Sequence, residues 1–185
     1  MIIENSRYKD YDKITLLAQT ARKEFNNDSN EWKQYIDQMI DLKDQEHRDD
    51  IDWRVLHIFN EAGSSETIPS FVHEKFKHTI EVLKSMEGVD RALINFVGPN
   101  SIIPHHVDSD ELPEYAETGI YNIVVGLFIP SEDPEQVALE IDGVVVGNKN
   151  DGAVIFDGQV PHSGYNKTNE WRVTLFLFVN KEAFK

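Results

Sequence analysis

The chain is predicted to fold as a single mainly β domain with N-terminal helices, in the form of a double-stranded β-helix, or jelly roll. Two observations carry this prediction. Amphipathic helical spacing dominates before residue 50, and short apolar runs separated by turn signals dominate after residue 88. Several short strands at such spacing are typical of a sandwich or barrel, not of an alternating parallel sheet. No linker divides the chain, so we expect one domain over 1–185, with 1–50 as helical support and 51–185 as the jelly-roll core.

The N-terminal part is expected to contain two helices. The first follows from apolar residues that recur at spacings of three and four and therefore share one helix face. These residues are Ile14, Leu17, Ala18, Ala21 and Phe25. A second amphipathic helix is predicted from Trp32 to Leu42, and the charged run 41–50 is expected to be a solvated exit segment without chemistry.

The rest of the chain is expected to be mainly strands. The run 53–60 is predicted to be a strand, 63–65 a loop, and 69–87 one helix that begins at Pro69 and ends near Gly88. Further strands are predicted from runs rich in Val, Ile and Phe. They cover 91–97, 121–129, 137–141, 144–146, 153–156 and 173–179. The pair Asp142-Gly143 predicts a hairpin turn of type I′.

Composition excludes several classes of function. The chain has no cysteine, which rules out disulfides, thiolate metal sites and a cysteine nucleophile. Its net charge of −15 disfavours nucleic acid and anionic lipid as partners, although solubility alone also explains such acidity. No signal-like start and no apolar run of the ~20 residues that span a membrane are evident. We therefore expect a cytoplasmic protein with no nucleic-acid or membrane partner, and the oligomeric state stays open.

Three residues form a candidate metal site. If residues 106–108 are extended, the side chains of His106 and Asp108 lie on one face of a strand. A second histidine, His162, follows the apolar run 153–156, where a loop can turn its side chain inward. Two histidines and one carboxylate make the facial triad that leaves three coordination positions of iron(II) open. The His-x-Asp pair alone is a weak signal that occurs often by chance.

The adjacent His105 offers an alternative ligand. An interpretation based on Pro104-His105 would choose it, but it would leave Asp108 at the wrong spacing. Neighbouring residues of a strand face opposite ways, so only His106 shares a face with Asp108. We therefore prefer His106.

Arg172 opens the apolar run 173–179 and is a candidate anion-binding residue. Burying a guanidinium group is costly unless an anion meets it. Its planar fork fits a carboxylate, such as the distal carboxylate of 2-oxoglutarate. The alternative is an arginine on the solvent side of an edge strand, paired with a local Asp or Glu.

At this point the chain resembles the aspartyl/asparaginyl β-hydroxylase family of Fe(II)/2-oxoglutarate-dependent dioxygenases. The resemblance covers about the last 135 residues and is densest in INFVGPNSIIPHHVD, GLFIP and VIFDGQVPHSGYNKTNEWRVTLF. Residues 99–101 stand at the family's turn, and an ungapped alignment from there reaches His106. The family's histidine–arginine pair, ten residues apart after Phe-Asp, matches His162 and Arg172.

The resemblance implies an activity. It implies an enzyme in which His106, Asp108 and His162 hold Fe(II) and carry the catalysis, with 2-oxoglutarate as co-substrate beside O₂. Such enzymes convert 2-oxoglutarate to succinate and hydroxylate an unactivated C–H bond, here expected to belong to an amino acid, free or within a peptide. A different class, a cupin acting as a metal-dependent isomerase or hydrolase or as a small-molecule binding module, would not need Arg172.

Some positions stay open. Val124 stands where the family has a histidine that assists with 2-oxoglutarate, and Tyr121 or Asn122 are candidates for that second contact. Asp157 is expected either to orient His162 or to close a turn. His57 is expected to be a core histidine, with a pocket-lining role as the alternative. The acidic segment 109–118 is either a solvated loop or a lid over the substrate.

Overall fold

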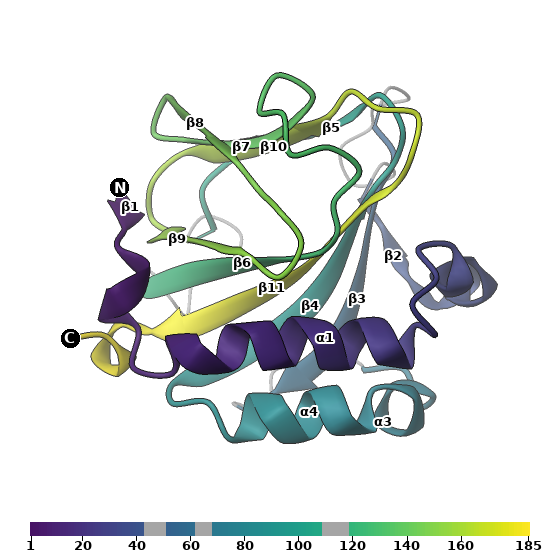
Figure 1. Ribbon diagram of the computed structural model, residues 1–185, viewed down its shortest axis with the longest axis horizontal. Helices are drawn as coiled ribbons and strands as arrows, with labels where there is room; N and C mark the ends of the chain where they lie inside the picture. The colour runs from purple at the N-terminus through teal and green to yellow at the C-terminus, as the bar shows by residue number, and fades with distance from the viewer. Residues whose placement is uncertain (43–50, 62–67, 109–118) are drawn as a thin grey trace.

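A computed structural model describes residues 1–42, 51–61, 68–108 and 119–185 of the chain. Two antiparallel sheets lie face to face, and helices cover the outer face of the larger one (Figure 1). The prediction of a mainly β jelly roll with helices outside it is confirmed. The predicted charged exit segment, the loop at 63–65 and the segment 109–118 lie outside or largely outside the described residues.

Within the described ranges, the larger sheet has seven strands and the smaller sheet has four. The order in the larger sheet is β1 (Ile2–Ile3), β9 (Ala153–Asp157), β6 (Ile120–Phe128), β11 (Arg172–Asn180), β4 (Val89–Val97), β3 (Trp53–Asn60) and β2 (Ile40–Asp41). The order in the smaller sheet is β5 (Ser101–His106), β10 (His162–Asn166), β7 (Val137–Ile141) and β8 (Val144–Gly147). Between β7 and β8, Asp142 and Gly143 both have positive φ, which confirms the predicted hairpin turn.

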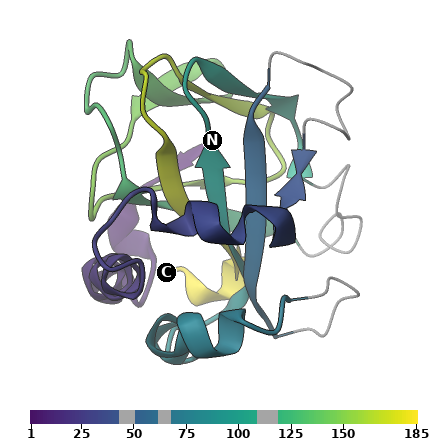
Figure 2. The same ribbon diagram turned by 90° about the vertical axis from the view of Figure 1, so that its right-hand side faces the viewer.

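The helices form one layer under the larger sheet, and the view in Figure 2 keeps the same order of layers. The α-helices are α1 (Ile14–Glu24), α3 (Val72–Lys75) and α4 (Lys77–Lys84). The chain also forms the 3₁₀ helices η1 (Asn5–Arg7), η2 (Tyr11–Lys13), η3 (Glu31–Gln38) and η4 (Lys181–Ala183). The predicted first helix is confirmed, and its apolar face is buried. Phe25, just after α1, packs edge-on against Phe76, Phe96 and Phe128 and so joins the helices to the sheet. No helix in these described ranges is long and apolar enough to cross a membrane.

Two predicted helices differ from the structure. The predicted helix from Trp32 to Leu42 is only partly present, because the segment forms the 3₁₀ helix η3, which ends at Gln38, and then the strand β2. Trp32 is buried against Phe96 and Trp171, and the pairing of Ile40 with Val55 extends the sheet, so tertiary contacts override the helical spacing. The predicted helix over 69–87 is divided at Phe76, whose backbone leaves the helical region.

The N-terminal part is therefore not wholly helical, because β1 and β2 form the two edges of the larger sheet. Two strands of the smaller sheet, β5 and β10, were also missing from the prediction. Their sequences, SIIPHH and HSGYN, lack the run of apolar residues that marks the other strands. These two strands carry the histidines of the candidate site.

The larger sheet is buried on both faces. Along β11, Leu175 and Leu177 face the helices, whereas Phe176 and Phe178 face the smaller sheet. Because both faces are buried, the strand reads as one continuous apolar run without alternation. The space between the two sheets holds an apolar cluster, to which Phe156, Phe176 and Phe178 belong, and a cavity.

Candidate active site

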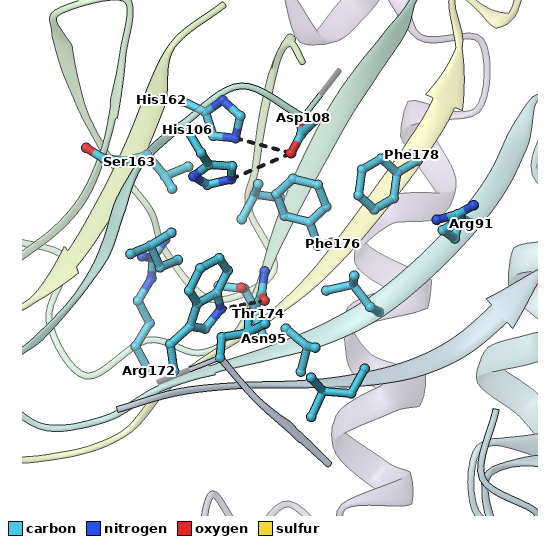
Figure 3. Close-up of a pocket in the computed structure, with 18 of the residues that line it drawn as sticks. Arg91, Asn95, His106, Asp108, His162, Ser163, Arg172, Thr174, Phe176 and Phe178 are labelled. Atoms are coloured by element: carbon cyan, nitrogen blue, oxygen red, sulfur yellow. Dashed lines mark hydrogen bonds and ion pairs between the residues drawn. The ribbon is translucent and has the colours of Figure 1, made fainter. Parts of the chain in front are cut away.

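A cavity of about 280 Å³ lies between the sheets. Its floor is the inner face of the larger sheet, and its roof comes from the smaller sheet (Figure 3). Most of its lining is apolar, but Asp108, His106, His162 and Arg172 all contribute to it. The structure thus brings four of the six predicted site residues into one cavity.

Strand pairing brings the two histidines together. His106 is the last residue of β5 and His162 is the first residue of β10, and the two are direct cross-strand partners. Their ring centroids are 4.3 Å apart. Asp108 follows β5, and its backbone N–H donates to the carbonyl oxygen of Gly158 at 3.2 Å. Asp108 Oδ1 lies 3.6 Å from His106 Nε2 and 3.7 Å from His162 Nε2, so three donor atoms converge on one point.

Backbone carbonyl groups orient both imidazole rings. Nδ1 of His106 donates to the carbonyl oxygen of Pro104 at 2.8 Å, and Nδ1 of His162 donates to that of Val160 at 2.9 Å. A carbonyl oxygen only accepts, so in the neutral ring the hydrogen is on Nδ1 and the Nε2 lone pair is exposed to a ligand. Such a bond to the second ring nitrogen is the usual way that proteins orient metal-binding histidines.

The electrostatics of the cluster suit a divalent cation. Burial, together with the neighbouring His106, lowers the pKa of His162 to about 4, so its ring is neutral near neutral pH. Burial raises the pKa of Asp108, against the opposing effects of His106 and Asn122. Nε2 of His162 is buried without a hydrogen-bond partner in the described part of the chain. A bound cation would satisfy this nitrogen and stabilise the buried carboxylate.

Asn122 belongs to this cluster in an unexpected role. Its side chain is fully buried on β6, and its Nδ2 donates to Asp108 Oδ2. A Cβ atom on Gly158 would lie 3.0 Å from both Asn122 Nδ2 and Asp108 Oδ2, so this glycine leaves room for the pair. Asn122 therefore holds the carboxylate and leaves Oδ1 of Asp108 for the cluster. The predicted contact of Asn122 with a co-substrate has no support in this geometry.

His105 points away from the cluster. Its side chain is 64% exposed and lies 3.4 Å from Glu140 on the outer side of the smaller sheet. The expected opposite orientation of His105 and His106 is therefore present. The extended geometry considered for 106–108 is not present, because β5 ends at His106 and Asp108 reaches the cluster from the following turn.

Arg172 lies at one end of the cavity. It is the first residue of β11, which runs between β6 and β4 in the middle of the larger sheet, so it is not an edge residue. The side chain is 1% exposed, and its Nη1 donates to the carbonyl oxygen of Ala138 at 3.4 Å. Its Nε and Nη2 have no partner among the described residues, and burial lowers its pKa to about 10. The group stays cationic at neutral pH and presents two unused donors.

Tyr121 is not brought to the cavity. Its ring packs against Phe184 with centroids 4.7 Å apart and lies 4.9 Å from Nζ of Lys181, on the helix side of the sheet. Asp157 closes a turn by accepting from the backbone N–H of Gln159 at 3.1 Å and pairs with Lys181 at 3.0 Å. Of its two expected roles, the structure supports the turn.

Further cavity residues were missed in the sequence. These are Arg91, Asn95 and Thr174, which line the cavity floor. His57 also lines the cavity, which agrees with the pocket-lining alternative for this residue. The indole N–H of Trp53 donates to Asn95 Oδ1 at 3.0 Å. The sequence did indicate two of these residues, because Arg91 and Asn95 interrupt an apolar run at positions that lie on one face of a strand.

Curated protein sequences gave no significant match. Similar solved structures include a prolyl-4-hydroxylase from Pseudomonas putida, with 15% identity over 95% of this chain and 90% of that chain and a TM-score of 0.49. A viral collagen prolyl hydroxylase from Paramecium bursaria Chlorella virus-1 has 14% identity over 70% and 79%, with a TM-score of 0.45. The family model described as Aspartyl/Asparaginyl beta-hydroxylase matches residues 16–182. The chain therefore belongs to the aspartyl/asparaginyl β-hydroxylase family.

Proposed function

We propose that the chain is an iron(II)- and 2-oxoglutarate-dependent hydroxylase that acts on an unactivated C–H bond of an amino acid, free or within a peptide. Membership of a hydroxylase family supports the reaction class. The observation that carries the co-substrate is Arg172, a buried cation with two unused donors in the cavity that also holds the three-residue cluster. A metal-dependent isomerase or a plain binding module has no need of such a cation.

His106, Asp108 and His162 would hold the iron. The donor set of two imidazole nitrogens and one carboxylate oxygen is the one that suits non-haem iron(II) and leaves positions open for other ligands. With 2-oxoglutarate and O₂, bound iron supplies the oxidising power for hydroxylation. The protein orients the ligands through the carbonyl groups of Pro104 and Val160 and through Asn122. The apolar side chains of its lining would limit the access of water to the reacting carbon.

Arg172 would hold the distal carboxylate of 2-oxoglutarate through its unused Nε and Nη2. Thr174 is two residues further along β11 and faces the same cavity, and its cross-strand partner on β4 is Asn95. These two polar side chains replace Tyr121 and Asn122 as the candidates for the second co-substrate contact, because they line the floor beside Arg172. Val124 also lines the cavity but offers no polar group.

The test is binding and turnover of 2-oxoglutarate. The native chain, loaded with Mn(II), should bind 2-oxoglutarate in a calorimetric titration, and with Fe(II) it should release succinate when free amino acids or peptides are supplied. Arg172→Met should weaken 2-oxoglutarate binding by roughly 10- to 150-fold, because this is the change in affinity that the loss of a charge-assisted hydrogen bond causes. Mn(II) binding should change far less, because Arg172 is not in the donor set.

Arg54→Met is the matched control, since Arg54 pairs with Asp41 and does not line the cavity. It should leave both affinities unchanged. If native protein binds the metal but not 2-oxoglutarate, or if Arg172→Met binds 2-oxoglutarate as native does, the co-substrate assignment is wrong and a non-oxygenase metal site becomes the better explanation.

A further inference from the structure

A single β-turn leads from β9 to β10 beside the candidate metal site. It is closed by a hydrogen bond from the backbone N–H of Val160 to the carbonyl oxygen of Asp157, at 3.2 Å. Since β9 belongs to the larger sheet and β10 to the smaller one, the turn, residues 157–160, carries the chain from one sheet to the other (Figure 1). His162, the first residue of β10, follows the turn directly after one intervening residue.

Two carbonyl groups of this turn hold two of the three candidate ligands. That of Gly158 accepts from the backbone N–H of Asp108 at 3.2 Å, and that of Val160 accepts from Nδ1 of His162 at 2.9 Å. Gly158 also donates its own N–H to the carbonyl oxygen of Ile120 at 3.2 Å, which joins the turn to the start of β6. The third ligand is oriented within its own strand. A shift of the turn would therefore move two ligands relative to the third.

Lys181 holds the turn from outside the cavity. It is the first residue of η4, and its Nζ donates to Asp157 Oδ2 at 3.0 Å and to Gln159 Oε1 at 3.1 Å. The other carboxylate oxygen of Asp157 accepts from the backbone N–H of Gln159 at 3.1 Å. Lys181 is not among the described residues that line the cavity, so an effect of this side chain on a bound metal has to pass through the turn.

The surroundings of the Lys181 ammonium group restrict its position. Its Nζ lies 4.9 Å from the ring centroid of Tyr121, which is the cross-strand partner of Asp157. A Cβ atom on Gly119 would lie 2.8 Å from this Nζ, so the glycine leaves the space that the ammonium group occupies. An exposed ion pair by itself contributes little, but an ammonium group that meets a carboxylate, an amide oxygen and an aromatic face limits where the turn can lie.

We infer that Lys181, through its pair with Asp157, is a positioning residue for the candidate metal site. The pair fixes the turn, and the carbonyl groups of the turn keep Asp108 and His162 in place. The donor atoms of the three candidate ligands lie within 4.8 Å of one another, and this arrangement is what the pair maintains. The inference rests on the proposed function in taking these residues as metal ligands, and it adds two residues that touch neither metal nor substrate.

The test is a calorimetric Mn(II) titration of the native chain and of Lys181→Met. This change keeps the apolar stem and removes the charge and the donors. It should lower the Mn(II) affinity about tenfold, at the lower end of the range for the loss of groups that orient metal ligands. Lys181→Arg restores the charge and the donors, and it should recover most of the affinity.

Lys75→Met is the matched control. Lys75 on α3 pairs with Glu31 at 2.6 Å, their side chains are 16% and 12% exposed, and neither residue is among those that line the cavity. For comparison, the side chains of Lys181 and Asp157 are 30% and 16% exposed. Because its ion pair is the more buried of the two, Lys75→Met should lower the melting temperature at least as much as Lys181→Met, and it should keep native Mn(II) affinity.

Asp157→Asn separates the ion pair from the closure of the turn. The amide keeps an oxygen for the backbone N–H of Gln159 but loses the charge that Lys181 meets. It should weaken Mn(II) binding as Lys181→Met does. The double variant should bind Mn(II) no more weakly than either single variant, because both changes break one contact. Additive losses would show that the two residues act separately, and the inference would be wrong.

Two results of the titration would also overturn the inference: native Mn(II) affinity in Lys181→Met, or an equal loss of affinity in Lys75→Met. If the native chain binds neither Mn(II) nor Fe(II), the proposed function fails, and the metal-free protein then decides the inference. NMR of isotope-labelled histidine rings reports which ring nitrogen carries the hydrogen. In the native chain His162 should carry it on Nδ1, where Val160 accepts, and Lys181→Met should lose this single form. An unchanged His162 signal in that case would refute the positioning role.

Discussion

The hydrogen bond from Asn122 to Asp108 makes a sharp test of how the metal site is built. Asn122→Ala removes the donor to Asp108 Oδ2 and leaves that oxygen buried without its partner. A hydrogen bond to a charged group contributes about 1.5–3 kcal/mol, so the affinity for Mn(II) should fall roughly 10- to 150-fold. Part of this loss comes from freer movement of the carboxylate, because the backbone bond of Asp108 to Gly158 holds the main chain and not the side chain.

The assay is a calorimetric Mn(II) titration of native and variant protein. Asn148→Ala is the matched control, because Asn148 is also a buried asparagine but lines a different pocket, beside Lys149 and Gly152. The control should lose some thermal stability and keep native metal affinity. Equal Mn(II) affinity in Asn122→Ala and native protein would refute the positioning role. An equal loss in both variants would indicate a general effect of removing a buried amide.

Three further predictions concern the ligands, the core and the turns. Mn(II) should raise the melting temperature of the native protein and of His105→Ala but not of His106→Ala, in a thermal shift assay; the reverse pattern would make His105 the ligand. Leu17→Ala should cost about 2–5 kcal/mol in urea unfolding, because Leu17 is fully buried between α1 and the sheet. Leu16→Ala should lower the free energy of unfolding by less than about 0.5 kcal/mol, because the neighbouring Leu16 is 55% exposed. Similar losses for both variants would contradict the burial of Leu17. Gly126→Ala should destabilise the chain far more than Gly143→Ala, because a Cβ on Gly126 would lie 2.1 Å from the carbonyl oxygen of Lys149, whereas one on Gly143 meets nothing within 4 Å. Equal melting temperatures of the two glycine variants would count against that close approach.

Local patterns of apolar residues in the sequence predict much of the fold. The spacing of Ile14, Leu17 and Ala21 predicts α1, and the apolar runs predict the central strands, because burial of one or both faces imposes these periods on the side chains. The Asp142-Gly143 turn was also predictable, since few residues adopt positive φ without strain. Local patterns failed where pairing with a distant segment decides the structure, as for β2, β5 and β10.

The residue types of the candidate site were likewise present in the sequence. His106, Asp108, His162 and Arg172 stand out because histidine next to a carboxylate, and an arginine that opens an apolar strand, are unusual in a core. What the sequence left open was which histidine faces inward, whether Arg172 is buried, and what Asp157, Asn122 and Tyr121 contact.

The tertiary structure alone decided those points. The register of β5 against β10 places His106 opposite His162, and the central position of β11 buries Arg172. The pairing of β4 with β11 places Arg91 at the far end of the same floor. Register depends on hydrogen bonds and packing between segments far apart in the chain, and a one-residue shift would reverse the face of every side chain. Local spacing therefore specifies which residues form a strand, whereas the pairing of strands specifies which of them share a cavity.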